Sequence, residues 1–366
     1  MRLPVTECTP RRAAARTFSL CGPCEKIGPV SALRTRYLAA ALLLAGCGSG
    51  GREPAIGEGF VAPATLNLRQ ELGPRQPSVA MVRHGERLEI LERRRRSVRV
   101  RASSGAVGWI DGDLLFGPEQ MEGLRALGRW AATLPSQGQA TVLDTLNVHT
   151  EPSRESPSFQ QFREGEHAAV VAHRLVASPS RTEDWSLVRL SSDEAGWVLT
   201  RALFMSIPDE VAQYAEGHRI MSYFALGEVK DGDQVKQNWL WTTISAGGQP
   251  YEFDAVRVFV WSRSRRRYET AFVDRKVKGY YPVEVVQKPG AGPSFSIIVE
   301  EKDGSRVRRT YAFQGYHVRL ESKAPWNHPV QTSPPPVAAD GKTPAKSYFG
   351  RLGETLASLR RKIFGR

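Results

Sequence analysis

The sequence of 366 residues predicts a mainly β protein. Three observations support this prediction. A set of short motifs occurs twice, and each copy consists of short alternating apolar and polar runs broken by Gly, Pro and Ser. A third region has longer alternating runs joined by turn residues, and such alternation is typical of strands with one buried face. We therefore expect two small β-barrels joined by a helix, an antiparallel β-meander that forms a sandwich or barrel, and a C-terminal amphipathic helix.

The N-terminal part contains an apolar run, Leu38 to Leu44, that follows Arg34 and Arg36. Small residues come next, which is the order of a secretory signal, and the run is too short to span a bilayer. We expect residues 1–46 to be a removed leader, of which residues 30–46 are the signal peptide itself.

The end of this run, Leu44-Ala45-Gly46-Cys47, resembles the lipobox of bacterial lipoproteins. The resemblance implies that Cys47 is the lipid attachment site and the first residue of the mature chain. The alternative is a buried apolar segment that happens to end in Cys. Residues 47–59 are rich in Gly and are expected to form a flexible tether.

Three further cysteines, Cys8, Cys21 and Cys24, precede the signal. Cys21-Gly22-Pro23-Cys24 matches the redox motif of thioredoxin-like proteins, but no strand precedes it as that motif requires. Val30 is a candidate alternative start, so residues 1–29 are expected to be a start-site artefact or to leave with the leader. No cysteine follows Cys47, and we expect no disulfide.

The internal repeat begins at Thr65-Leu66-Asn67-Leu68-Arg69, which returns as Thr145-Leu146-Asn147-Val148-His149, 80 positions later. Gly108-Trp109-Ile110 returns as Gly196-Trp197-Val198, 88 positions later. The change in offset locates an insertion of eight residues in the second copy, expected as a polar loop within Ala172 to Asp184.

This motif order resembles the bacterial SH3-like domain over residues 60–116 and 139–205. The second copy departs from the pattern at His149, and only that copy has the tryptophan found at Trp185. The resemblance makes the marked polar and aromatic positions candidates for ligand binding: Asn67, Arg69, Trp109, Asn147, Trp185, Trp197, and, at an arginine-rich hairpin tip, Arg94 and Arg95.

Each candidate has a structural alternative. Trp109 and Trp197 are expected to fill the core of each barrel rather than to contact a ligand. Asn67 and Asn147 are expected to satisfy backbone groups of adjacent loops. The run Arg93 to Arg96 is either a solvated turn or an anion contact, because four guanidinium groups on one tip can grip phosphates or carboxylates.

Between the copies, residues 117–138 form a helical linker, with a helix predicted from Pro118 to Ala132. Proline and acidic residues at its start and arginines later suit the helix dipole. Met121, Leu124, Leu127 and Ala131 share one face, which is expected to dock both copies.

The third domain, residues 211–322, differs from both copies. Short turns such as Asp231-Gly232-Asp233 join its runs, which favours hairpins. Its aromatic residues are candidates for a binding face or for core packing. The alternating runs are residues 219–226, 235–244, 251–261, 268–274, 295–301 and 307–320.

The chain ends in a Pro-rich linker, residues 323–345, and a basic amphipathic helix, residues 346–366. This helix is expected to lie on anionic headgroups, in a partner groove, or on its own protein. Its proposed contact residues are Leu352, Leu356, Leu359, Arg360, Arg361 and Lys362.

The net charge of +13 is concentrated at the two ends of the chain. Residues 47–322 hold 36 Lys and Arg against 34 Asp and Glu. A nucleic-acid-binding protein concentrates its excess charge on a folded face, so we expect no nucleic-acid partner.

No catalytic pattern emerges. The seven His residues have no metal-ligand spacing, and neither a Gly-x-Ser-x-Gly elbow nor a phosphate-binding loop occurs. No metal, cofactor or catalytic residue is expected. The prediction is that the chain is not an enzyme, with a hydrolase in residues 211–322 as the exception to test.

Together, these features predict a cell-envelope lipoprotein. By resemblance, its SH3-like domains bind peptides of peptidoglycan, and the lipid on Cys47 anchors the protein in a membrane. Gly48 after the cysteine favours the outer membrane, facing the periplasm. The alternative is an assembly or scaffold lipoprotein that binds envelope proteins. The sequence specifies neither the ligand nor the oligomeric state.

Overall fold

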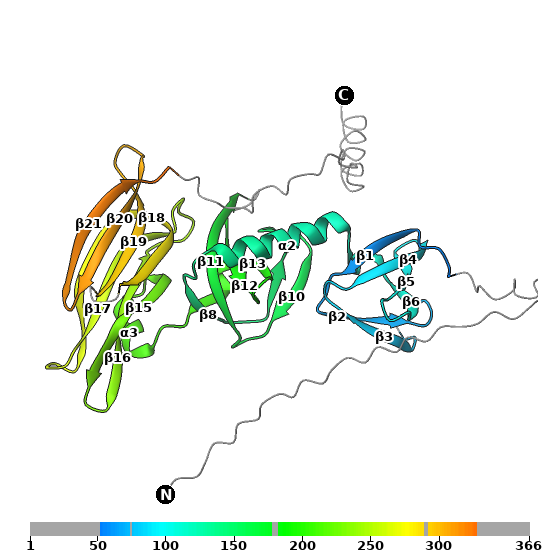
Figure 1. Cartoon of the computed structure of the whole chain (residues 1–366), viewed down its shortest axis with the longest axis horizontal. Helices are drawn as coiled ribbons and strands as arrows, with labels where there is room; N and C mark the ends of the chain where they lie inside the picture. Colours follow the sequence, from blue (N-terminus) through cyan, green and yellow to red (C-terminus); the bar gives the residue numbers. More distant parts are fainter. Residues whose placement is uncertain (1–51, 74, 178–181, 289–291, 328–366) are drawn as a thin grey trace, which may run out of the picture. The chain divides into compact units, whose positions relative to one another are not determined.

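The computed structural model describes residues 52–73, 75–177, 182–288 and 292–327. The described residues from Pro54 onward belong to one compact unit. Cys47, the leader, the basic helix 346–366 and most of the Pro-rich linker lie outside the described residues. Within them the protein is mainly β and contains three antiparallel sheets of seven strands each (Figure 1).

The first sheet has the strand order β3-β2-β6-β5-β4-β1-β7. Its core contains Val61, Leu68, Leu88 and Val100, all buried. The sheet runs from β3 to β7, and no pairing among the described strands joins these edges, so the expected closed barrel is not found. The strands are β1 (Gly57–Val61), β2 (Thr65–Arg69), β3 (Ser78–Arg83), β4 (Arg87–Arg94), β5 (Ser97–Arg101), β6 (Val107–Asp111) and β7 (Leu115–Phe116).

The second sheet has the order β10-β9-β13-β12-β11-β8-β14. Each strand occupies the place of the first-sheet strand that comes seven strands earlier in the chain, so the repeated motifs correspond to repeated connectivity. This sheet is also open, and the barrel prediction fails here too. The strands are β8 (Gly138–Val142), β9 (Leu146–His149), β10 (Ser158–Phe162), β11 (His167–Ala177), β12 (Thr182–Arg189), β13 (Ala195–Leu199) and β14 (Leu203–Met205).

Two expected boundaries are wrong. The insertion in the second copy is not a polar loop, because β11 and β12 continue to pair as far as Ala177 and Thr182. Val176 packs against the apolar core, which explains why this segment extends the hairpin. The tether was expected to reach residue 59, but β1 begins at Gly57, which pairs with Ile90 of β4.

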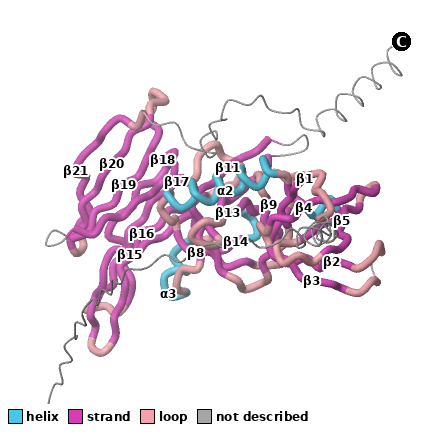
Figure 2. The backbone as a smooth tube through the Cα atoms, turned by 45° about the vertical axis from the view of Figure 1, so that its right-hand side comes forward, coloured by secondary structure: helices cyan, strands magenta, loops and turns pink. Residues whose placement is uncertain are grey.

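Helix α2 (Pro118–Thr133) joins the two repeat copies and lies across β13 (Figures 1 and 2). Pro118 occupies the first turn, where its missing N–H costs no hydrogen bond. At the other end Arg189 donates hydrogen bonds to the carbonyls of Ala131 and Leu134, at 2.9 and 2.7 Å. The buried residues of the helix are Met121, Leu124, Leu127, Gly128, Trp130 and Ala131.

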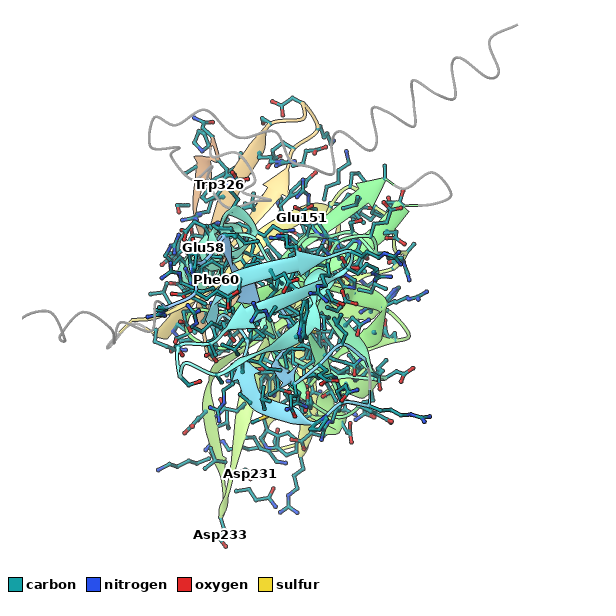
Figure 3. The ribbon with its side chains drawn as sticks, turned by 90° about the vertical axis from the view of Figure 1, so that its right-hand side faces the viewer. Glu58, Phe60, Glu151, Asp231, Asp233 and Trp326 are labelled. Carbon is teal, nitrogen blue, oxygen red and sulfur yellow. The ribbon has the colours of Figure 1, made fainter. Side chains whose placement is uncertain are left out.

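The third sheet follows the chain order β15 to β21, so the predicted antiparallel meander is confirmed. Asp231 and Asp233 lie at the tip of the β15–β16 hairpin (Figure 3), where Gly232 has φ 61°. The expected run 307–320 is two strands with a turn at Gly315. The strands are β15 (Arg219–Asp231), β16 (Gln234–Ile244), β17 (Phe253–Ser262), β18 (Arg267–Lys288), β19 (Gly292–Glu300), β20 (Arg306–Gln314) and β21 (His317–Pro325).

Short helical elements lie beside the strands, and β21 extends into the segment expected to be a linker. The α-helical turn α3 (Asp209–Ala212) and the 3-10 turn η3 (Gln213–Ala215) precede the third sheet. The other 3-10 turns are η1 (Gly112–Leu114) and η2 (Thr200–Ala202).

The side chain of Gln137, the residue directly before β8 of the second sheet, hydrogen-bonds the backbone of the third sheet where the pairing of β18 with β19 is interrupted. The ladder between β18 and β19 shifts register between Tyr280 and Glu284. There the Gln137 amide accepts from the backbone N–H of Val283 at 3.0 Å and donates to its carbonyl at 3.3 Å. Gln137 thus satisfies both backbone groups of Val283, as a strand partner would.

Candidate functional site

The first repeat copy presents a tryptophan on the outer face of its sheet. Trp109 pairs with Arg69 on β2 and with Arg99 on β5. Its neighbours Gly108 and Ile110 are buried on the core side, whereas Trp109 is only half-buried. The expectation that Trp109 fills the core is therefore wrong, because strand alternation directs its ring to the opposite face.

Cationic side chains surround this ring. The Arg94 guanidinium carbon lies 5.3 Å from the centroid of Trp109, within cation–π range. Glu92 holds Arg94 by a 2.6 Å hydrogen bond and lies 3.4 Å from Arg99. Arg69 donates to the carbonyl of Gln76 at 3.0 Å. The arrangement is an ordered aromatic surface with a cationic rim.

Two other candidates of the first copy, Asn67 and Arg95, lie close in sequence to the residues of this surface. Asn67, two residues before Arg69 on β2, is exposed, and its side-chain oxygen accepts from Ser78 at 3.4 Å. Arg95 stands at the tip of the β4–β5 hairpin with φ 52° and is exposed. The arginine run thus forms the predicted hairpin tip, and Arg94 alone of the two arginine candidates contacts the tryptophan.

In the second copy the corresponding tryptophan is covered. Trp197 pairs with His149 and Leu187, as Trp109 pairs with Arg69 and Arg99. Helix α2 packs on this face, and Trp197 is buried with Leu124 and Leu127. It is therefore buried as expected, but beneath the helix rather than in the core between strands.

The two remaining candidates of the second copy, Trp185 and Asn147, differ in their exposure to solvent. Trp185 is fully buried, with the His149 ring edge-on at 5.4 Å between centroids. Asn147 is exposed and accepts from Gln161 at 2.9 Å. A cavity of about 500 Å³ beside the helix is lined by Leu124, Leu127, Trp197 and Pro152, among others.

The two copies also differ in charge. Residues 54–116 contain ten arginines against seven acidic residues, a net charge of +3. Residues 138–205 contain six arginines against nine acidic residues, a net charge of −3. Only the first copy combines an open tryptophan with a positive balance, which suits an anionic ligand.

A buried charged cluster between β11, β12 and the start of β17 was missed from the sequence. His173 hydrogen-bonds Asp184 and lies 3.9 Å from an oxygen of Glu252. Burial lowers the pKa of His173, but the hydrogen bonds and negative charges of Asp184 and Glu252 outweigh it and raise the pKa to about 9. Burial likewise raises the pKa of Asp184, and the His173 hydrogen bond overcomes this and lowers it.

We expect this cluster to make stability depend on pH. The folded-state pKa of His173 lies above its ordinary value of 6.5, so its stabilising effect is complete below pH 6.5 and is lost as pH rises through about 9. Denaturant unfolding at several pH values should show this decline. His173→Gln should flatten it, whereas the exposed His317→Gln should leave it unchanged; an equal decline in both variants would contradict the assignment.

Neighbouring groups complete the cluster. Arg219 donates to the carbonyls of Thr200 and, at 2.9 Å, Leu203. Burial raises the pKa of Tyr281 well above its usual value. Only tertiary packing brings Glu252 to His173, and no spacing in the sequence indicates the pair.

Residues 52–327, apart from their gaps, contain no group of three His, Cys, Asp or Glu side chains that could hold a metal ion. No helix in that part of the chain is long and apolar enough to cross a bilayer.

No family model and no curated protein matches the chain. Among solved structures it aligns with an NlpC/P60 family protein from Bacillus cereus at 10% identity and a TM-score of 0.21, covering 58% of this chain and 93% of that one. It also aligns with NlpC2 and NlpC1 from Trichomonas vaginalis, both at 12% identity, with TM-scores of 0.16 and 0.17. These alignments cover 75% and 76% of this chain and 98% and 95% of theirs.

These matches correct one expectation. The prediction that the chain is not an enzyme conflicts with neighbours that belong to a peptidase and hydrolase family, and it is withdrawn. At TM-scores this low the matches carry no argument about activity, so no reaction is assigned from them. All four cysteines of the chain precede residue 48, outside the described residues.

Proposed function

We propose that this chain is a cell-envelope lipoprotein whose first repeat copy, a divergent SH3-like domain, binds an anionic wall ligand. By resemblance, that ligand is a peptide of peptidoglycan, and peptide carboxylates supply the negative charge. The lipid on Cys47 would hold the protein on the outer membrane, facing the periplasm. The lipobox and the repeated motif order support the two parts of this proposal.

The observation that carries it is the contrast between Trp109 and Trp197. Both occupy the same position in equivalent sheets, yet helix α2 covers only Trp197. Trp109 stays half-buried beside Arg94, Arg69 and Arg99. An aromatic ring with an arginine rim binds a peptide backbone by stacking and its carboxylates by charge-assisted hydrogen bonds.

Co-sedimentation with purified peptidoglycan tests this proposal. Residues 48–366 should bind, and Trp109→Ala should weaken binding about tenfold or more, as expected for a central aromatic contact. Phe204→Ala, which removes an exposed aromatic ring from the second copy, is the matched control and should bind like the parent. Failure of the parent protein to co-sediment would reject the proposal.

The anchor requires a separate measurement. Mass spectrometry of the mature N-terminus should find a diacylglyceryl-modified Cys47. An intact Met1 in the mature protein would contradict both the leader and the lipid attachment site.

A further inference from the structure

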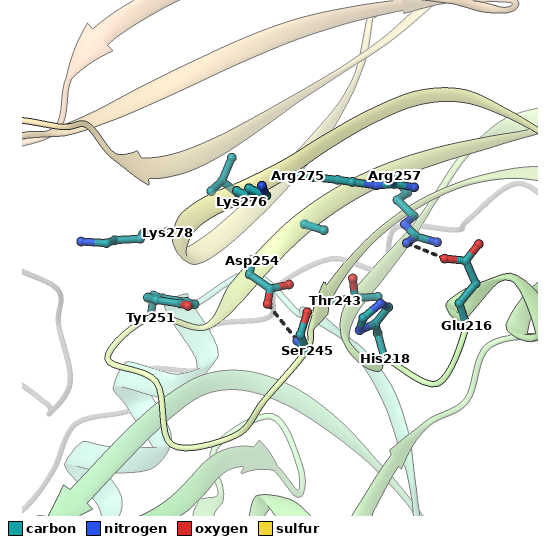
Figure 4. A pocket seen from close by; sticks show the side chains of 12 residues that line it. Glu216, His218, Thr243, Ser245, Tyr251, Asp254, Arg257, Arg275, Lys276 and Lys278 are labelled. Carbon is teal, nitrogen blue, oxygen red and sulfur yellow. Dashed lines mark hydrogen bonds and ion pairs between the residues drawn. The ribbon is translucent and has the colours of Figure 1, made fainter.

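The third sheet contains a cavity that lies away from the repeat copies. This cavity, of about 520 Å³, lies where β16 ends and β17 begins, against the middle of β18 and beside the segment that precedes β15 (Figure 4). Its lining residues include Glu216, Thr243, Asp254, Arg257, Arg275 and Lys276. None of these belongs to the motifs that support the envelope function.

Two buried hydrogen-bonding groups in the cavity wall have no partner. The Thr243 hydroxyl and the Nε of Arg257 make no hydrogen bond within the described part of the chain. Thr243 is 1% exposed and Arg257 is 6% exposed. A buried polar group without a partner is costly and rare, so both positions point to an absent acceptor.

The Arg257 guanidinium is held firmly in place. One terminal nitrogen donates to the carbonyl of Tyr214 at 2.8 Å, and the other donates to Glu216 at 3.1 Å. These contacts use two of the five N–H groups of the guanidinium, and the Nε–H is among those that remain. In Figure 4 the Thr243 hydroxyl points toward the side of the cavity where Arg257 and Arg275 lie.

Two more cations line the cavity without an ion-pair partner. Strand register aligns Thr243 with Ala255, and Ala255 with Arg275, so Arg275 stands across the ladder from Thr243. Lys276 follows with φ 61°, a left-handed conformation that is uncommon for a non-glycine residue. Both side chains are exposed, and neither forms an ion pair with another residue in the described ranges.

The acidic groups of the cavity are already engaged. Glu216 accepts from Arg257, and Asp254 accepts from the backbone N–H of Ser245 at 2.9 Å. Lys278 is paired with Glu300 at 2.6 Å. The Asp254 carboxylate keeps its charge, so Arg275 and Lys276 together leave one positive charge in excess, which favours an anionic ligand.

We infer that this cavity binds a phosphate group carried on a small organic body. The phosphate oxygens would accept from Thr243, from Nε of Arg257, and from Arg275 and Lys276. A carboxylate has only two acceptor oxygens for these donors, whereas a phosphate ester has three terminal ones. The cavity is larger than a phosphate ion needs, and the Tyr251 ring on its wall offers a surface for the attached group.

Isothermal titration of residues 48–366 with glycerol 3-phosphate, inorganic phosphate, acetate and glycerol tests this site. Glycerol 3-phosphate or inorganic phosphate is expected to bind saturably, with one molecule per chain. Acetate should bind at least tenfold more weakly, and glycerol should give no binding heat. Tighter binding of glycerol 3-phosphate than of inorganic phosphate identifies a phosphate ester as the ligand class; equal binding identifies free phosphate. No saturable binding of either overturns the inference.

Variants separate this site from general charge attraction. Arg275→Gln with Lys276→Gln should weaken phosphate binding at least tenfold, whereas Arg263→Gln with Lys302→Gln removes the same charge from exposed turns and should not. Thr243→Val keeps the shape and removes a hydroxyl without a partner, so it should weaken binding without lowering thermal stability. Equal losses in both double variants, or unchanged binding in Thr243→Val, would refute the site.

Discussion

Gly128→Ala is expected to destabilise the protein by about 3 kcal/mol, although alanine is the better helix former. A Cβ at this position would lie 1.8 Å from the backbone oxygen of Asp193 and 2.7 Å from its carbonyl carbon. These are backbone atoms of the β12–β13 turn, which a side-chain rotation cannot move. Helix α2 would have to lift from the second sheet and uncover Trp197.

The matched control is on the same helix. Gly123 is exposed, and a Cβ there meets no atom within 4 Å. Gly123→Ala should therefore stabilise the protein by about 0.5–1 kcal/mol through helix propensity alone. Urea unfolding followed by tryptophan fluorescence should show the two variants moving in opposite directions. A stabilised Gly128→Ala variant would contradict the close contact between helix and turn.

Gly279→Ala should cost about 3 kcal/mol in the third sheet. Gly279 pairs with Phe253, and an added Cβ would lie 1.9 to 2.3 Å from three atoms of that ring. Phe253 is fully buried, so the ring cannot rotate away without displacing its neighbours. An aromatic ring lying over a strand glycine is a recurrent means of covering the exposed backbone.

Thermal and urea unfolding of three variants test this arrangement. Gly247→Ala adds a Cβ where no atom lies within 4 Å and should change stability by less than about 0.5 kcal/mol. Phe253→Leu combined with Gly279→Ala should be more stable than the sum of the two single changes predicts, because the smaller side chain leaves space. Strict additivity would show that the clash is not the cause.

The sequence predicted the features of the fold that depend on local patterns. The motifs around Asn67 and Asn147 lie on equivalent strands β2 and β9, and Gly232 lies in the turn expected between two runs. The prediction of closed barrels was wrong. Whether a sheet closes depends on hydrogen bonding between its two edge strands, and the alternation of residues within one strand carries no information on that pairing.

The functional surfaces were only partly predictable. Trp109 and Trp197 have the same local motif, and the difference between them comes from helix α2, which packs on one copy only. The phosphate-binding cavity combines Glu216, Thr243, Arg257 and Arg275, from four separate segments. Each residue alone resembles an ordinary strand or loop position, and only the register of β16, β17 and β18 places them together.

The Gln137 contact with Val283 has a consequence for dissecting this protein. A truncated chain that ends after the second repeat copy would lack Val283, so the Gln137 amide would lose its hydrogen-bond partner. A fragment beginning at the third sheet would retain an unpaired bulge at Val283. Limited proteolysis should therefore release the second and third sheets as a single resistant fragment, because the repeat boundary in the sequence is not a boundary of cooperative unfolding.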